Sequence, residues 1–343
     1  MPSEESRWSR AKHASRTILF LAGVGLAGAL VWTTGWPAIQ ANLASIGWRF
    51  GALVALYLLA EIAFVLGWWS VMDPRPPLSS LPDLLRIYLA GNSLNYLSPG
   101  SVAGEPLRAS LLRDRMKTSS AIASVTIFKH AHLFSQSVFL AVGVAIALIF
   151  FDLPQVVRWV ALASQAVLCG LLVLMTWALH KGSFAPLLAG LSRWKLLARR
   201  LRRYQQAALD LDEQIRRFYV DRRPHFFSAA GWCFLGWCGG LLETYLVLRL
   251  LAPSRGWATA FAVESLAMVL NNMFLFVPGR AGTAEGVRAG VFVLLGLPAP
   301  TGVAYGLVRR ARELLWVLPG LGFLARRPSG RSRHDAVADG QAR

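Results

Sequence analysis

Long, nearly uncharged apolar runs are the feature that most restricts how this chain can fold. An α-helix needs about 20 apolar residues to cross a hydrocarbon core about 30 Å thick. Six runs of that length cover residues 17–36, 48–72, 121–151, 157–180, 225–251 and 301–324. Only 16% of the 343 residues are charged and 55% are hydrophobic, whereas a soluble domain carries about 25% charged residues. The sequence therefore predicts an all-α polytopic membrane protein.

Two further apolar stretches are each interrupted by a Pro-Gly pair. They are residues 84–104, with Pro99-Gly100, and residues 260–297, with Pro278-Gly279. Because proline and glycine break helices, we expect two re-entrant or broken-helix hairpins here, in addition to about six full spans. The first run exceeds the apolar part of a signal peptide and is followed by further spans, so we expect it to remain uncleaved.

Basic residues are distributed unevenly between the connections. The segments 1–16, 73–118, 181–223 and 325–343 contain 26 lysines and arginines, whereas the other connections contain only Arg49, Arg158 and Arg255. By the positive-inside rule, the first group is cytoplasmic and both termini lie inside. We expect cytoplasmic tails over 1–16 and 326–343 and one transmembrane domain over 17–325. The net charge of +18 therefore belongs to loops, which excludes a nucleic-acid-binding domain.

The longest cytoplasmic connection contains a basic amphipathic pattern over about 193–219. Apolar residues recur three and four positions apart from Trp194 to Phe218, with arginines between them. This spacing is typical of an amphipathic helix. Two interpretations stay open: a helix that lies in the anionic inner leaflet, or a helix that packs under the bundle.

The two interrupted stretches match each other, and the match extends into the flanking spans. The matched pairs, 179 to 182 residues apart, are Asn92 and Asn271, Pro99 and Pro278, Gly100 and Gly279, Glu105 and Glu285, Arg108 and Arg288, Lys129 and Arg309, and Glu61 and Glu243. The first unit, about 48–151, begins outside, whereas the second, about 225–324, begins inside. Their topology is therefore inverted, as in many secondary transporters whose broken helices meet near the midplane and line a substrate site.

Eight charged residues fall inside the apolar spans and hairpins. They are Glu61, Lys129, Glu243, Glu264, Arg309, Arg310, Arg312 and Glu313. A charge at the bilayer centre costs about 3 kcal/mol on insertion scales, so such residues usually face a cavity or a partner. The simpler interpretation is mutual pairing, for example Arg309 with Glu313 one turn later. The functional hypothesis is that Lys129 and Arg309, at opposite depths, accept an anionic head group on one side and release it on the other.

The sequence gives little support to other chemistry. Histidine ordinarily titrates near neutral pH, which makes His130 and His132 candidates for proton transfer. Residues two apart on a helix point to different faces, so we do not expect a metal pair. The three cysteines lie in apolar runs and are expected to be buried small side chains. No nucleophile elbow, zinc-protease motif or phosphate loop is present. We therefore expect no cofactor, no metal site and no enzymatic activity.

Three segments carry a family resemblance: residues 92–108 (NSLNYLSPGSVAGEPLR), 276–286 (FVPGRAGTAEG) and 307–314 (LVRRAREL). They resemble the flippase-like transmembrane family of lysylphosphatidylglycerol synthases, over about 17–325. The segments 264–266 and 312–320 resemble its stand-alone subgroup associated with hopanoid biosynthesis. The resemblance implies translocation of a membrane lipid without aminoacyl transfer, by a multi-pass protein of the bacterial inner membrane.

The resemblance and the internal repeat together assign a candidate site. The candidates for substrate binding are Asn92, Pro99, Gly100, Gly104, Glu105, Arg108, Lys129, Asn271, Pro278, Gly279, Gly282, Glu285, Arg288, Arg309, Arg312 and Glu313. The candidates for proton coupling are Glu61, His130, His132 and Glu243.

The expected function is movement of an amphiphilic lipid of anionic, aminoacylated or isoprenoid type between leaflets. The expected partners are membrane lipids and lipid-biosynthesis proteins. Two alternatives stay open. One is a scaffold of a lipid-biosynthesis complex that transports nothing, and the other is an intramembrane transferase with Glu105 or Glu285 as its base.

Overall fold

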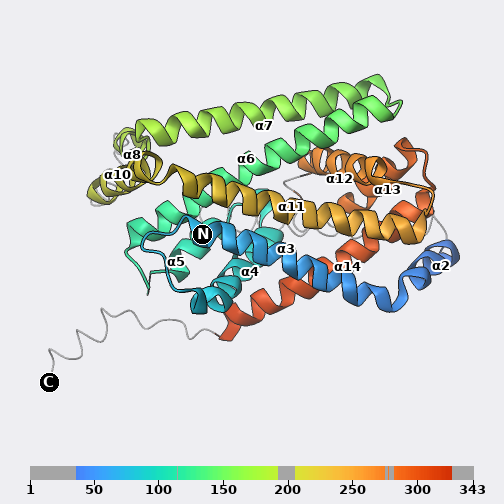
Figure 1. The fold of residues 1–343 in the computed structure, drawn as a ribbon, viewed down its shortest axis with the longest axis horizontal. Helices are drawn as coiled ribbons and strands as arrows, with labels where there is room; N and C mark the ends of the chain where they lie inside the picture. Colours follow the sequence, from blue (N-terminus) through green and yellow to red (C-terminus); the bar gives the residue numbers. More distant parts are fainter. Residues whose placement is uncertain (1–35, 114, 192–204, 275–276, 278–281, 327–343) are drawn as a thin grey trace, which may run out of the picture.

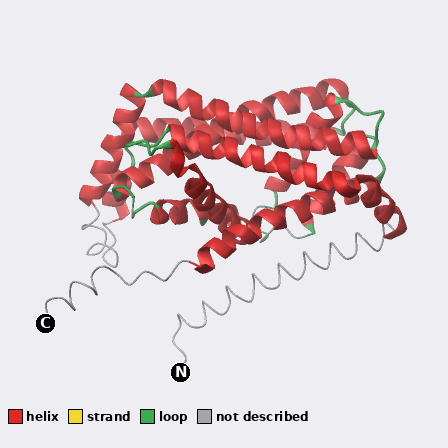
Figure 2. Cartoon of the chain, turned by 60° about the horizontal axis from the view of Figure 1, so that its bottom comes forward, coloured by secondary structure: helices red, strands yellow, loops and turns green. Residues whose placement is uncertain are grey.

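The computed structural model describes residues 36–113, 115–191, 205–274, 277 and 282–326. Within these residues the chain forms helices, turns and loops and no β-strand (Figure 2). The helices are α2 (Trp36–Ile46), α3 (Phe50–Ser70), α4 (Leu81–Leu97), α5 (Gly104–Leu111), α6 (Thr118–Phe150), α7 (Gln155–Lys181), α8 (Phe184–Leu191), α10 (Gln205–Asp221), α11 (Arg223–Leu251), α12 (Trp257–Asn272), α13 (Thr283–Leu294) and α14 (Ala299–Arg326). Three single 3₁₀ turns, η1 (Gly47–Arg49), η2 (Leu78–Ser80) and η3 (Pro99–Ser101), join them. The predicted all-α membrane fold is confirmed.

Four helical segments in the described part are long and apolar enough to cross a membrane. They are Ala44–Ser70, Thr118–Phe150, Gln155–Lys181 and Arg223–Leu251. Each corresponds to a predicted span, whereas the predicted span 17–36 lies almost entirely outside the described residues. Helix α14 has 28 residues, or about 42 Å at 1.5 Å per residue, which is long enough. It is not among the four apolar segments because it contains four charged side chains between positions 309 and 313.

Both predicted hairpins are present as pairs of shorter helices. In the first, α4 ends at Leu97, η3 follows, and α5 returns from Gly104. In the second, α12 ends at Asn272 and α13 begins at Thr283, while Pro278 and Gly279 lie outside the described residues. The hairpins occupy opposite ends of the long helices (Figure 1). This is the arrangement that an inverted repeat predicts.

Helices α3 and α11 form an antiparallel pair at the centre of the repeat. Close contacts through small residues join Gly67 to Ala229, Gly236 to the Phe64 ring, and Gly239 to Ala60. The positions rise along α11 as they fall along α3, so the two helices run in opposite directions (Figure 1). The two units of the repeat therefore meet along these helices.

Each hairpin packs against the last helix of the other unit. Helix α4 contacts α14, where the Ser93 hydroxyl donates a hydrogen bond to the Val317 carbonyl at 2.9 Å. Helix α12 contacts α6, where Ser265 lies against Gly143. The two contacts follow the same pattern, in which the first arm of each hairpin packs on the last long helix of the other unit. Because each hairpin packs on a helix of the other unit, both hairpins lie in one central region.

Gly104 sets how closely the two arms of the first hairpin approach. A Cβ atom at this position would lie 2.2 Å from the Gly91 carbonyl oxygen, an impossible distance for backbone atoms that cannot rotate away. The Gly104 amide also donates a 2.6 Å hydrogen bond to Asn95 Oδ1, which fixes the start of α5.

We expect the substitution Gly104→Ala to force α5 away from α4 and to lower the yield of folded protein. Overpacking of this kind typically costs about 1–3 kcal/mol. Thermal unfolding of detergent-solubilised protein would measure the loss. Gly231→Ala is the matched control because a Cβ atom there meets nothing within 4 Å. Equal melting temperatures for the two variants would contradict the expectation.

The described part of the basic amphipathic segment forms α10. Its apolar residues Leu211, Ile215 and Phe218 are buried, and Gln214 donates a 2.7 Å hydrogen bond to Ser119 at the start of α6. Asp212 accepts hydrogen bonds from the first backbone amides of α8. Residues 193–204 of the predicted segment lie outside the described residues. In α10 the apolar face therefore packs against the bundle, as the second interpretation proposed.

Helix α7 contributes little to the core. Its side chains include exposed Trp159, Leu171 and Trp177, and such an apolar surface is suited to lipid acyl chains. Cys169 on this helix is exposed, whereas Cys233 is buried and Cys238 is half-buried. The expectation that all three cysteines are buried is therefore wrong for Cys169, because an apolar run at the edge of a membrane bundle faces outward.

Candidate functional site

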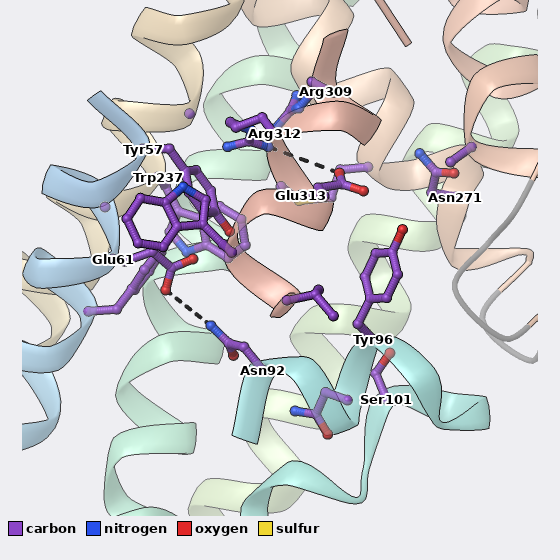
Figure 3. A pocket seen from close by; sticks show the side chains of 18 of the residues that line it. Tyr57, Glu61, Asn92, Tyr96, Ser101, Trp237, Asn271, Arg309, Arg312 and Glu313 are labelled. Carbon is purple, nitrogen blue, oxygen red and sulfur yellow. Dashed lines mark hydrogen bonds and ion pairs between the residues drawn. The ribbon is translucent and has the colours of Figure 1, made fainter. Parts of the chain in front are cut away.

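A cavity of about 430 Å³ lies where the two units of the repeat meet. Helices α3, α4, α6, α11, α12, α13 and α14 all contribute to its wall, together with the turn after α4. Polar residues from both hairpins point into it, including Asn92, Ser101 and Asn271 (Figure 3). Two hairpins that lie 179 residues apart in the sequence therefore contribute to one site.

The candidate residues separate into two groups. Those that line the cavity are Asn92, Asn271, Arg288, Arg309, Arg312 and Glu313, with Glu61 and His132 from the proton-coupling set. Those that the structure describes outside its wall are Gly100, Gly104, Glu105, Arg108, Lys129, Gly282, Glu285, His130 and Glu243. Pro99 begins the turn η3. Pro278 and Gly279 lie outside the described residues.

In the first unit, a chain of hydrogen bonds runs from α5 to α3. Arg108 donates to Asn92 Oδ1 at 2.6 Å, and Asn92 Nδ2 donates to Glu61 Oε2 at 3.0 Å. The Arg108 guanidinium also lies 4.2 Å above the centre of the Tyr88 ring. Asn92 therefore separates a buried cation from a buried carboxyl group.

Lys129 lies beside this chain but outside the cavity. Its ammonium group is 2.9 Å from Glu105 Oε1, and 40% of its side chain is exposed. Glu105 is therefore the carboxylate partner of Lys129, as Glu264 is of Arg309. The hypothesis that Lys129 and Arg309 accept and release a head group at opposite depths stays a prediction, with Lys129 placed beside the cavity and not in its wall.

In the second unit, Arg309 is held from several sides. Its Nη2 donates to Glu264 Oε1 at 2.9 Å, and its Nη1 bonds the other carboxylate oxygen and the Tyr305 hydroxyl. Thr244 donates to Glu264 at 2.7 Å. The expected pairing of Arg309 with Glu313 is wrong, because Glu313 instead pairs with Arg288 at 3.2 Å. The closest charged partners of Arg309 and Glu313 therefore lie on the neighbouring helices α12 and α13 and not on α14 itself.

Two further arginines of α14 connect the units. Arg312 lies 2.9 Å from Glu243 on α11, and its guanidinium is 3.7 Å from the centre of the Tyr57 ring on α3. Arg310 donates to Glu285 Oε1 on α13 at 2.6 Å and to the Tyr96 hydroxyl on α4. The three arginines that line the cavity, Arg288, Arg309 and Arg312, thus each have a carboxylate within ion-pair distance. Such pairing offsets the cost of placing charges in a low-dielectric interior.

The two histidines face different surroundings, as their spacing predicted. His130 Nδ1 is 2.6 Å from the Tyr219 hydroxyl of α10, and Nε2 is 2.9 Å from the Thr176 hydroxyl of α7. His132 lies among aromatic rings at the cavity wall, with Phe64 and Trp237 each 5.1 Å away. His130 is therefore directed away from the cavity.

Aromatic residues of the site escaped the sequence analysis. Tyr57, Tyr96, Trp237 and Trp316 line the cavity, yet aromatic side chains inside apolar runs look like ordinary core or lipid-facing residues. Glu264 stood out as an intramembrane charge but was not among the candidate site residues. Within the described ranges, no group of three His, Cys, Asp or Glu side chains is arranged to hold a metal ion.

Comparison with known proteins gives one family. The family description "Lysylphosphatidylglycerol synthase TM region" matches residues 19–320. No curated protein and no solved structure matches the chain. The match covers both hairpins, the cavity between them and all the charged residues described above. The chain therefore belongs to the family of the lysylphosphatidylglycerol synthase transmembrane region.

Proposed function

We propose that this protein moves an amphiphilic lipid between the two leaflets of a membrane, without chemical change to the lipid. The observation that carries the proposal is the polar, charge-lined cavity between two hairpins that enter the bundle from opposite ends. In an inverted-repeat transporter such a site opens to each side in turn. Membership of a family defined by a lipid synthase's membrane region supports a lipid substrate.

The cavity chemistry supports a polar or anionic head group. Arg288, Arg309 and Arg312 provide guanidinium groups at the wall, and guanidinium groups bind phosphate in two-pronged geometry. Their present carboxylate partners would have to share or release them when a phosphate enters. The acyl chains would stay in the bilayer beside the apolar outer surface, so the protein needs to shelter only the head group. Hopanoids, which are polycyclic lipids, form a second substrate class within this proposal.

The basic residues support one orientation. The connection between α3 and α4, the connection between α5 and α6, and helix α10 are rich in basic residues and lie at the end of the bundle that holds the first hairpin (Figure 1). The connections between α6 and α7 and between α11 and α12 lie at the other end, and the sequence places Arg158 and Arg255 in or next to them. By the positive-inside rule we place the first hairpin on the cytoplasmic side of a bacterial plasma membrane. The second hairpin then enters from outside.

Leaflet-resolved translocation by purified protein in liposomes tests the proposal. We expect fluorescent anionic, zwitterionic or hopanoid lipids to cross faster than in protein-free vesicles. Arg288→Ala should reduce the rate at least about tenfold, which corresponds to about 1.4 kcal/mol of lost interaction. Arg255→Ala is the control, since that arginine lies near Gly296 at the outer end and outside the cavity.

The contrary outcome is equally clear. If no lipid of the panel moves, the transport proposal fails, and a scaffold of a lipid-biosynthesis complex becomes the better interpretation. A new head-group product in mass spectra of the lipids would instead indicate a transferase.

A further inference from the structure

Glu61 differs from the other carboxylates of the cavity in its hydrogen-bond partners. Its donors are the neutral Asn92 amide, at 3.0 Å, and the neutral Tyr57 hydroxyl. By contrast, Glu264 binds Arg309 and Glu313 binds Arg288. Among the described residues no lysine or arginine forms an ion pair with Glu61 within 4 Å, although only 3% of the residue is exposed. Neutral donors satisfy a carboxyl group in either charge state, whereas an arginine partner favours the ionised form.

The repeat provides an internal comparison. Glu243 occupies the position equivalent to Glu61, and Arg312 lies 2.9 Å from it. Arg312 therefore forms its ion pair with the carboxyl group of the second unit, whereas on Glu61 of the first unit it acts only as a nearby charge. This asymmetry indicates that Glu61 does more than balance a structural charge.

Arg312 and Arg108 are the nearby cations that act on Glu61, and neither forms an ion pair with it. Arg312 pairs with Glu243, and Asn92 stands between Arg108 and Glu61. Arg108 is 3% exposed and donates to Asn92 Oδ1. When Glu61 is ionised, the positive and negative charges in and next to the cavity wall balance, with four arginines and four carboxylates. They are Arg108, Arg288, Arg309 and Arg312, and Glu61, Glu243, Glu264 and Glu313. A proton on Glu61 leaves one positive charge in excess. That excess favours an anionic head group, and loss of the proton removes it.

Other ionisable groups surround Glu61 on several helices. They are Tyr57 on α3, Tyr88 on α4, Arg108 on α5, His132 on α6, Glu243 on α11, and Arg312 and Glu313 on α14. The arginines and carboxylates among them are held by the contacts described above. Glu61 itself lies at the cavity wall with its carboxyl group directed toward Asn92 (Figure 3). Water in the cavity can therefore deliver a proton to it directly.

We propose that Glu61 is a proton-binding site that couples lipid movement to a proton gradient. In one conformation Glu61 accepts a proton from cavity water and the anionic head group binds. In the other conformation the proton leaves to water on the opposite side and the head group is released. This inference rests on the proposed transport function, so its test must separate proton binding from transport.

Proton binding is measured first, without any lipid movement. Infrared difference spectra of the purified full-length protein between acidic and alkaline buffer should contain a carboxylic-acid C=O band that Glu61→Gln removes. Glutamine retains the shape of the side chain and its hydrogen bonds to Asn92, so this variant should fold. The control is Glu213→Gln on α10, whose exposed carboxylate lies outside the cavity and has its pKa lowered to about 2 by Arg216 and Arg217. A spectrum that Glu61→Gln leaves unchanged would overturn the proposal.

Coupling is measured next, in proteoliposomes with an imposed gradient of one pH unit. Wild-type protein should accumulate the transported lipid in one leaflet by up to about tenfold, the limit for one proton per lipid. Glu61→Gln should abolish this accumulation, Glu61→Asp should restore part of it, and Glu213→Gln should behave like wild type.

The outcomes separate the two proposals. Lipid movement that ignores the gradient in wild-type protein refutes proton coupling and leaves transport standing. If no lipid moves in any preparation, the transport function fails, and with it the coupling role of Glu61, even where the infrared band shows that Glu61 binds a proton.

Discussion

Replacing Arg309 by alanine should both destabilise the protein and abolish lipid movement. The change removes the ion-pair partner of Glu264, whose side chain is 8% exposed, and leaves only Thr244 and Tyr305 to bond it. Removing one partner of a buried ion pair typically costs about 3–5 kcal/mol because the other charge stays buried. We therefore expect a clearly lowered melting temperature in detergent, together with no detectable translocation in liposomes.

A double variant separates the structural role of Arg309 from its transport role. Arg309→Met combined with Glu264→Gln removes both charges and should recover most of the lost stability, since replacing a whole buried pair is often nearly neutral. Transport should remain absent because the guanidinium group is still missing. Arg158→Ala is the control, as its partner Asp152 is fully exposed and such pairs contribute at most about 1 kcal/mol. Translocation at the wild-type rate by the double variant would show that Arg309 only maintains the fold.

The architecture was predictable because its signals are local or periodic. Apolar length marks each span, a Pro-Gly pair marks the first hairpin, and the recurrence of Asn92 as Asn271 marks the repeat. These features need no knowledge of how one helix is rotated against another. Both hairpins followed from them, whereas the antiparallel contact of α3 with α11 became visible only in the structure.

The charge partners were not predictable in the same way. Helical spacing favours Arg309 with Glu313, but the bundle presents Glu264 to the former and Arg288 to the latter. Lys129 matches Arg309 in the repeat, yet it lies outside the cavity with Glu105. Packing between helices far apart in sequence decides which face of a helix meets a cavity. The positions of the intramembrane charges alone therefore do not predict their partners.

Removing the side chain of Arg310 should uncouple the two hairpins. Arg310 reaches Tyr96 at the tip of the first hairpin and Glu285 in the second, so one guanidinium group bridges segments that enter from opposite ends. In Arg310→Ala, Glu285 would stay buried, at 5% exposure, without this partner. We expect a loss of stability of about 3 kcal/mol or more and at least about a tenfold fall in translocation rate.

Tyr96→Phe distinguishes the bridge from the ion pair. It removes the hydrogen bond from Arg310 to the first hairpin but retains the aromatic ring near the guanidinium group and the pair of Arg310 with Glu285. Stability should therefore fall by only about 1 kcal/mol, the usual contribution of one hydrogen bond. If the bridge must break in each transport cycle, Tyr96→Phe should change the translocation rate much more than it changes stability. A rate that simply follows stability in both variants would mean that Arg310 holds the fold together and takes no part in the movement of the hairpins. The comparison thus decides whether the polar contacts between the hairpins are fixed supports or contacts that open and close as the head group crosses.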